Sequence, residues 1–284
     1  VNTIVSQNLA SLLETGSIVA LRLANRLINF PLGIFAMGIS TAIFPTLSRL
    51  VAKNEMAEFR KTFSFGLRVV FFITIPSAVG LAFLRVPIVR LLFESGEFTA
   101  VDTQATALAV LFYAPGLFAQ SAIQIITRGY YSLQDTITPV KVGLVTVIIN
   151  FLLSLSFLKW TTLGHGGLAL AFSITSILNM LIALFILRKK LGGVDGLRLI
   201  STFVRAVIGS LVMGAAVYYT SHYLGLMVNT GRTLGRFIQT FGAIGVGVVV
   251  YLIASIVLRM EETRFIWNLI KERFSKKASE GTLE

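Results

Sequence analysis

The protein has 284 residues, of which 55% are apolar and 13% charged, and its mean hydropathy is +0.81. Soluble domains carry about 25% charged residues, so this composition excludes an ordinary soluble protein. The net charge of +12 does not indicate nucleic-acid binding, because the Lys and Arg residues lie mainly in short connections between long apolar runs. The chain contains no cysteine, which excludes disulfides and thiolate metal sites.

The long apolar runs predict membrane-spanning helices, since a backbone in the hydrocarbon layer must satisfy its own hydrogen bonds. The fold class is therefore all-α and polytopic. Because the sequence opens inside an apolar stretch, we interpret it as part of a longer protein. An opening remnant at 1–13 is followed by seven predicted spans, at 17–49, 62–84, 101–127, 139–158, 167–187, 199–224 and 237–258. We expect Ser17 to be an N-cap and 53–61 and 128–138 to be polar links.

The distribution of basic residues predicts the orientation. Eighteen of the 25 Lys and Arg residues lie near one side of the predicted bundle and five near the other. Positive loops face the cytoplasm, so the C-terminus is predicted to be cytoplasmic. The tail at 261–284 has apolar residues at helical spacing, which favours an amphipathic helix on anionic membrane lipid; a helix that docks a partner is the alternative.

Catalytic and metal-binding residues are not predicted. All 13 acidic residues lie in connections, at helix ends or in the tail, whereas intramembrane proton chemistry needs an acid or histidine within the membrane. His165 and His222 are placed in outer loops, with no neighbours at metal-ligand spacing. We therefore predict no enzyme activity, no metal and no cofactor, and leave a coupling ion open.

Two arginines fall within the first complete span. Arg22 and Arg26 are four residues apart, so they share a helix face, and Arg26 lies about 14 Å from the helix start, near mid-membrane. A guanidinium there costs at least ~2.5 kcal/mol and suits a phosphate or pyrophosphate. Asn25 and Asn29 add polar groups, which predicts an anion site. The alternatives are that Arg22 reaches the outer interface and that Arg26 bonds to carbonyls of a kinked neighbour.

Several strings are similar to the MurJ/MviN family of lipid II flippases. They are ANRLINFPLG at 24–33, GISTAIFPTLSR at 38–49, GEFTAVD at 96–102 and GYYSLQDTITPVK at 129–141. Four matches in the same order are specific, and they cover residues 17–141; beyond that, the order and number of helices agree.

The resemblance implies the second half of a fourteen-helix exporter-superfamily protein whose first lobe is missing here. It implies a C-terminal lobe at 1–191, two additional helices at 192–260 that form a groove for the lipid tail, and the cytoplasmic tail. Arg26 then matches an arginine that grips the pyrophosphate of lipid II. The family often has an acid where Asn25 stands. Some members also carry acids of a sodium site where Ser6 and Ser154 stand, the latter one turn after Asn150, which makes these three residues weak ion-site candidates.

The resemblance therefore implies transport of lipid II from the inner to the outer leaflet of a bacterial inner membrane by alternating access. Two alternatives remain open at this point. One is a drug or polysaccharide exporter on the same scaffold, and the other is a non-transporting scaffold that recruits cell-wall enzymes through its tail.

Overall fold

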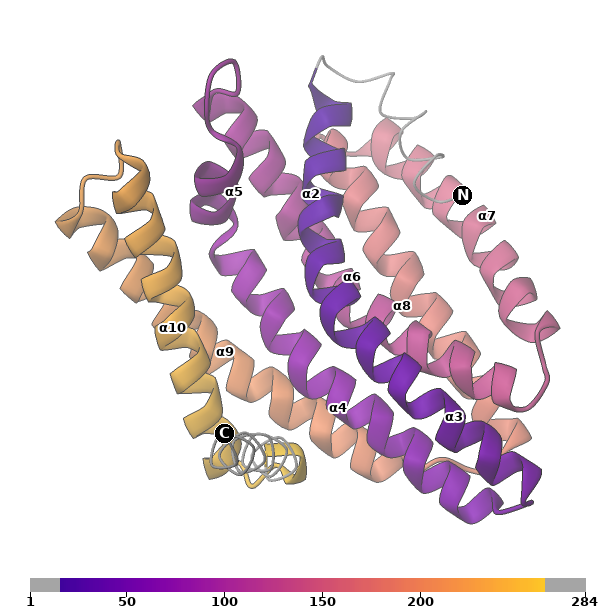
Figure 1. Cartoon of the computed structure of the whole chain (residues 1–284). Coiled ribbons are helices and arrows are strands. Elements are labelled where there is room, and N and C mark those ends of the chain that lie inside the picture. The colour runs from indigo at the N-terminus through magenta and orange to yellow at the C-terminus, as the bar shows by residue number, and fades with distance from the viewer. Residues whose placement is uncertain (1–15, 264–284) are drawn as a thin grey trace, which may run out of the picture.

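The computed structural model describes residues 16–263, and every regular secondary-structure element within them is a helix (Figure 1). Among these residues, seven helical rods are long and apolar enough to cross a membrane, as the sequence predicted. The predictions for the remnant at 1–13, for Ser6 and for 264–284 lie outside the described residues. In chain order the elements are α2 (Ser17–Pro31), η1 (Leu32–Met37), α3 (Gly38–Ala52), α4 (Met56–Phe83), α5 (Arg85–Phe93), α6 (Ala100–Ser132), α7 (Ile137–Trp160), α8 (His165–Lys190), α9 (Gly196–Met227) and α10 (Thr233–Val257).

The first rod contains a local change of helix type. α2, η1 and α3 run continuously from Ser17 to Ala52, but the turn after Pro31 is π-helical. Proline removes a backbone donor, and single π-turns of this kind are frequent at functional sites. The residue that precedes the helix is Gly16, at φ 99°, and Ser17 is the first helical residue without a capping bond. The prediction of Ser17 as the N-cap was therefore wrong.

Helix α6 is the centre of the bundle. It packs against α2, α3, α4, α5 and α8, while α7 lies outside α8. Its start is fixed by a capping box: the Thr99 backbone N–H and hydroxyl donate to the Asp102 carboxylate, over 2.9 and 2.8 Å. Gly116 allows the close approach of α8, because a Cβ there would lie 3.0 Å from the Ser173 Cα.

The pair α9 and α10 forms a helical hairpin on the opposite side of the bundle from α7 (Figure 1). α9 packs along α4, and α10 contacts α9 and α5. Gly247 allows this packing, since a Cβ there would lie 2.6 Å from Val217 Cγ2. We refer to residues 196–257 as the α9–α10 hairpin.

Candidate functional site

The predicted arginine face lies on the side of α2 that the rest of the described chain leaves uncovered. Leu21, Ala24 and Ile28 are buried against a cluster that includes α6 residues. Arg22 and Arg26 are both exposed on the other side of the helix. The alternation follows from helical periodicity, because residues four apart share a face. The two arginines therefore lie on the same exposed side of α2, as their spacing predicted, and their role in binding an anion stays a prediction.

The polar groups on this face have few partners. The Asn29 side-chain amide donates to the Asn25 side-chain oxygen over 2.6 Å, one turn away. Within the described residues neither Arg22 nor Arg26 forms a salt bridge or donates a side-chain hydrogen bond. Two cations without a counter-ion on a membrane span are costly unless water or a bound anion faces them. Chemically, this face can hold a phosphate.

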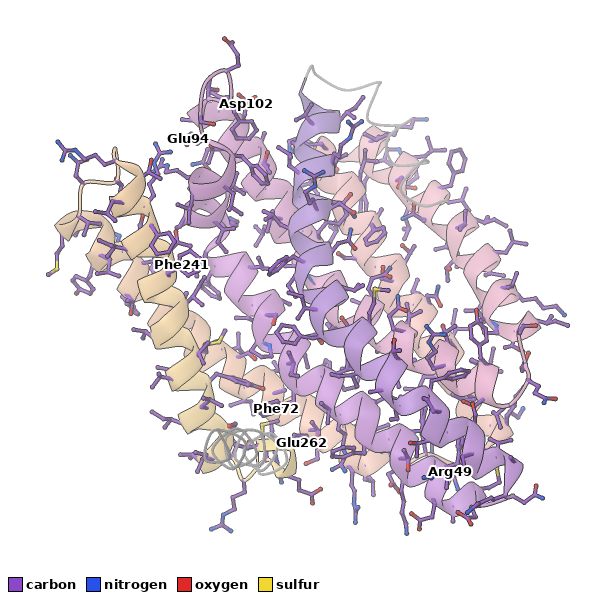
Figure 2. The ribbon with its side chains drawn as sticks, in the orientation of Figure 1. Arg49, Phe72, Glu94, Asp102, Phe241 and Glu262 are labelled. Carbon is purple, nitrogen blue, oxygen red and sulfur yellow. The ribbon has the colours of Figure 1, made fainter. Side chains whose placement is uncertain are left out.

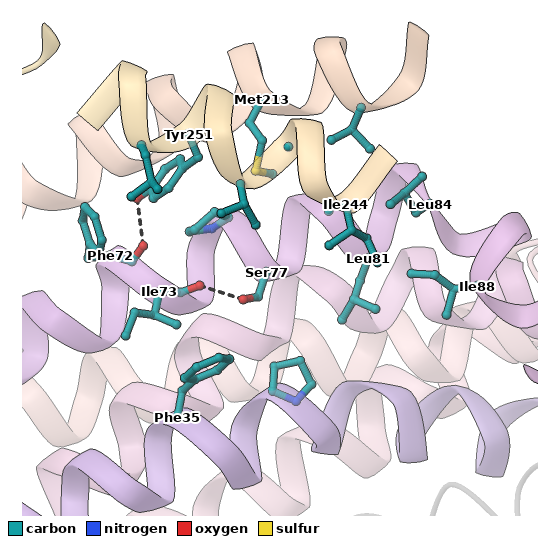
Figure 3. Close-up of a pocket in the computed structure, with 17 residues that line it drawn as sticks. Phe35, Phe72, Ile73, Ser77, Leu81, Leu84, Ile88, Met213, Ile244 and Tyr251 are labelled. Carbon is teal, nitrogen blue, oxygen red and sulfur yellow. Dashed lines mark hydrogen bonds between the residues drawn. The ribbon is translucent and has the colours of Figure 1, made fainter. Parts of the chain in front are cut away.

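An apolar groove of about 400 Å³ lies between the first rod and the α9–α10 hairpin (Figure 3). Phe35 of η1 lies on one side of it, and Met213 and Tyr251 lie on the other (Figure 3). Its polar side chains bond to the walls: the Ser77 hydroxyl donates to the Ile73 carbonyl over 2.7 Å, and the Tyr251 hydroxyl to the Phe72 carbonyl over 2.8 Å. The groove therefore offers hydrocarbon surface only, which suits an apolar chain.

One end of the hairpin is fixed by Glu94, which follows α5. Its carboxylate accepts bonds from Arg236 of α10 over 3.1 Å, from the Thr103 hydroxyl of α6 over 2.8 Å and from Arg90 over 3.3 Å. Burial by itself raises the pKa of Glu94, but the Thr103 bond and the charges of Arg90 and Arg236 outweigh it and hold the pKa below its usual value. Glu94 is therefore an anion at neutral pH that joins α5, α6 and α10.

The other end of the hairpin is held by the residues after α10. Figure 2 shows Glu262 in the lower part of the view and Glu94 in the upper part. Arg68 of α4 is 9% exposed and lies 2.7 Å from the Glu261 carboxylate and 3.2 Å from that of Glu262. Glu262 is 1% exposed and also accepts a bond from Thr202 of α9 over 3.2 Å. The hydrogen bond from Arg68 lowers the pKa of Glu261. This cluster joins α4, α9 and the end of α10.

A polar seam joins α7 to α8 and contains the two described members of the weak ion-site prediction. Asn150 and Ser154 are fully buried. The Asn150 amide donates to the Thr175 hydroxyl over 3.1 Å, and Asn179 donates to Thr146 over 3.2 Å. The side-chain oxygens of Asn150 and Ser154 have no hydrogen-bond partner among the described residues. The third member, Ser6, lies outside these residues.

The prediction that both histidines lie in loops was wrong. His165 is the first residue of α8, and its Nε2 lies 2.8 Å from the Ala105 carbonyl of α6. His222 lies in α9, where its ring stacks on that of Tyr218. Within the described residues, no group of three or more His, Cys, Asp or Glu residues could hold a metal ion.

The ion pairs that anchor the α9–α10 hairpin were not predicted from the sequence. Arg68 and Glu261 are 193 positions apart, and Arg236 and Glu94 are 142 apart. The only sequence signal was an arginine within a span and a pair of acids immediately after the last one. Nothing in either pattern identifies the partner.

Comparison with known proteins identifies the family. A family model described as "Lipid II flippase MurJ" matches residues 1–238. The chain belongs to this family. The MurJ family assignment confirms the resemblance found in the sequence, and together with the seven apolar helices it makes the chain part of a multi-pass inner-membrane protein.

Comparison with individual MurJ proteins gives the same family assignment. The chain is 35% identical to "Probable lipid II flippase MurJ" of Vibrio cholerae, over 89% of this chain and 47% of the relative, and 34% identical to that of Haemophilus influenzae, over 77% and 44%. A solved structure titled "Lipid II flippase MurJ, inward closed conformation" matches with a TM-score of 0.72 and 33% identity, over 91% of this chain and 50% of that one. The chain therefore spans about half the length of the MurJ proteins that it matches.

Proposed function

We propose that this chain is the second half of a transporter that flips lipid II across the inner membrane, and not an enzyme. The observation that carries the proposal is the Arg22–Arg26 face of α2, which is exposed on a membrane span and has no counter-ion within the described residues. A guanidinium pair of this kind matches the pyrophosphate of a lipid-linked precursor. The names of the MurJ relatives support the same substrate.

The groove gives the lipid tail a place beside the arginine face. The π-helical η1 continues α2 from Pro31, so the rod that carries Arg26 also contributes Phe35 to the groove. A lipid with a charged head and a long hydrocarbon tail needs both surfaces. We place the head group against Arg22 and Arg26, assisted by Asn25 and Asn29, and the polyprenyl tail in the groove.

Transport also requires a second lobe facing the arginines, so that the site opens to each leaflet in turn. In this proposal the described helices act with a first lobe of the same protein, and the C-terminus faces the cytoplasm. The chain is divided into a lobe at 1–191, the pair of helices at 192–260 and a tail at 261–284.

The α7–α8 seam is the proposed place for a coupling ion. The side-chain oxygens of Asn150 and Ser154 that lack a hydrogen-bond partner are neutral oxygen ligands in a buried site. Without a carboxylate they bind a monovalent cation weakly, so the seam contributes less to the transport proposal than the arginine face does.

The proposal is tested by replacing Arg26 in the full-length protein and asking whether it supports growth of a flippase-depleted strain. We expect Arg26→Ala to abolish complementation and Arg26→Lys to restore it in part, since lysine keeps the charge but loses the two-pronged geometry. Lys53→Ala, which removes an exposed cation just past the end of the same rod, is the matched control and should grow normally.

Normal growth of Arg26→Ala at normal expression would reject the assignment. If Arg26→Ala still moves lipid II but fails to export another solute, the protein is a drug or polysaccharide exporter. If deletion of 264–284, which leaves the Arg68 cluster intact, abolishes growth while lipid II binding is unchanged, it is a scaffold.

A further inference from the structure

A second cavity, of about 460 Å³, lies near the Glu94 end of the α9–α10 hairpin and shares no lining residue with the apolar groove. It is formed where α4 meets α5 and by the facing residues of α9 and α10. Phe83 and Tyr218 form part of its wall, with their rings 6.4 Å apart. Unlike the groove, this cavity is lined by an arginine and a histidine.

The polar side chains that line the cavity are positively charged or neutral. Arg85 lines it and uses one guanidinium nitrogen to bond the Ala82 carbonyl over 2.8 Å. Arg85 forms no salt bridge with any described residue, and none of the eight lining residues is acidic. His222 stands beside it on the same lining, and Gln239 is fixed by its bond to the Ser221 carbonyl over 3.0 Å. The cavity therefore has a positive charge without a counter-ion.

The surroundings place this cavity at the surface of the membrane. Three tyrosines near this end of α9 are exposed, namely Tyr218, Tyr219 and Tyr223. Exposed tyrosines gather at the level of lipid head groups, where the ring lies among hydrocarbon and the hydroxyl in water. Lipid phosphates lie at this same depth. A pocket at this depth with an aromatic wall and a guanidinium that has no acidic counter-ion among the described residues suits a phosphate attached to a lipid chain.

We propose that this cavity binds the head group of an anionic phospholipid, with the phosphate at Arg85 and His222 and the first carbons of the lipid against Phe83 and Tyr218. The site is separate from the arginine face of α2, and the proposal does not depend on the transported substrate. A soluble anion is the less favoured ligand, because the aromatic wall gives it no contact.

The test is native mass spectrometry of the purified full-length protein in detergent, titrated with phosphatidylglycerol, with phosphatidylcholine and with inorganic phosphate. We expect phosphatidylglycerol to be retained in preference to the other two. Arg85→Gln should weaken its binding about tenfold, the usual effect of losing one charge-assisted hydrogen bond. Arg232→Gln removes an exposed cation that precedes α10 but does not line the cavity, and it should leave binding unchanged.

A second variant keeps the proposal testable if Arg85→Gln does not fold. His222→Phe keeps the stacked ring beside Tyr218 but removes the imidazole N–H, and it should also weaken phosphatidylglycerol binding, by less than Arg85→Gln. Unchanged binding in both variants would overturn the proposal. So would an equal loss in Arg232→Gln, which would indicate general charge attraction, or equal retention of inorganic phosphate, which would indicate a soluble-anion site.

Discussion

At the scale of single residues, the buried cation Arg68 has the largest expected effect on stability. It is paired with Glu262, which is 1% exposed, so loss of the cation leaves a carboxylate whose only partner among the described residues is Thr202. We predict that Arg68→Met lowers the free energy of unfolding by about 3 kcal/mol, because breaking one side of a buried pair leaves an uncompensated charge. Thermal unfolding of the protein in detergent measures the loss.

The same helix provides the control. Lys61 pairs with Glu58 over 2.7 Å, but these side chains are 65% and 55% exposed. Exposed pairs contribute less than about 1 kcal/mol, so Lys61→Met should unfold close to the wild-type temperature. Equal losses in the two variants would show that the Arg68 cluster is no stronger than a surface pair.

At the scale of helix pairs, the distance between α6 and α8 depends on Gly116. A methyl group there would lie 3.0 Å from the Ser173 Cα, which is backbone and cannot rotate away. We predict that Gly116→Ala destabilises the protein by about 1–3 kcal/mol, the range found for overpacked cores. Thermal unfolding measures the change.

Gly143 of α7 is the matched control for this prediction, because a Cβ there meets nothing within 4 Å. Gly143→Ala should leave stability unchanged or raise it by up to about 1 kcal/mol, since alanine favours the helix. A stable Gly116→Ala protein would show that the two helices can separate without cost.

The sequence predicted the number and order of the helices, but several ends were placed wrongly. The link at 53–61 is shorter, because α4 begins at Met56. Its first turns place Phe59 and Phe63 in the core while Glu58 and Lys61 are exposed, so polar residues there mark one face of a helix rather than a loop. Likewise, α6 continues to Ser132 because Tyr130 is buried and donates to the Ala183 carbonyl over 2.8 Å.

The candidate site was likewise predicted only in part. Spacing alone placed Arg22 and Arg26 on one face, and the structure confirms this because both lie on one regular helix. The pairing of Arg68 with Glu261 and Glu262 depends instead on how α10 returns to α4. Local periodicity carries no information about such a contact, so it could not have been predicted.

At the scale of the whole molecule, the α9–α10 hairpin is joined to the bundle at two separate ends. Arg236 and Glu261 are 25 residues apart, which is about 37 Å if helical throughout. We predict that Arg236→Gln and Arg68→Met destabilise the protein independently, so that the double variant loses the sum of the two effects within about 0.5 kcal/mol. Unfolding of the single and double variants in parallel measures this.

The contrary result has a distinct meaning. If the second substitution costs little once the first is made, then release of one end frees the whole hairpin. The two ends would then anchor one wall of the groove cooperatively.

The π-turn of the first rod also changes how that rod can be compared with others. A π-turn holds about one residue more than an α-turn. The side chains of α3 are therefore rotated by about 100° from where an unbroken α-helix continuing α2 would place them. A helical wheel drawn without a break from Ser17 to Ala52 therefore assigns the second half of the rod to the wrong face. Removing one residue between Leu32 and Met37 would close the π-turn to an α-turn and leave Arg22 and Arg26 facing the same way relative to α3, because the turn already absorbs that residue.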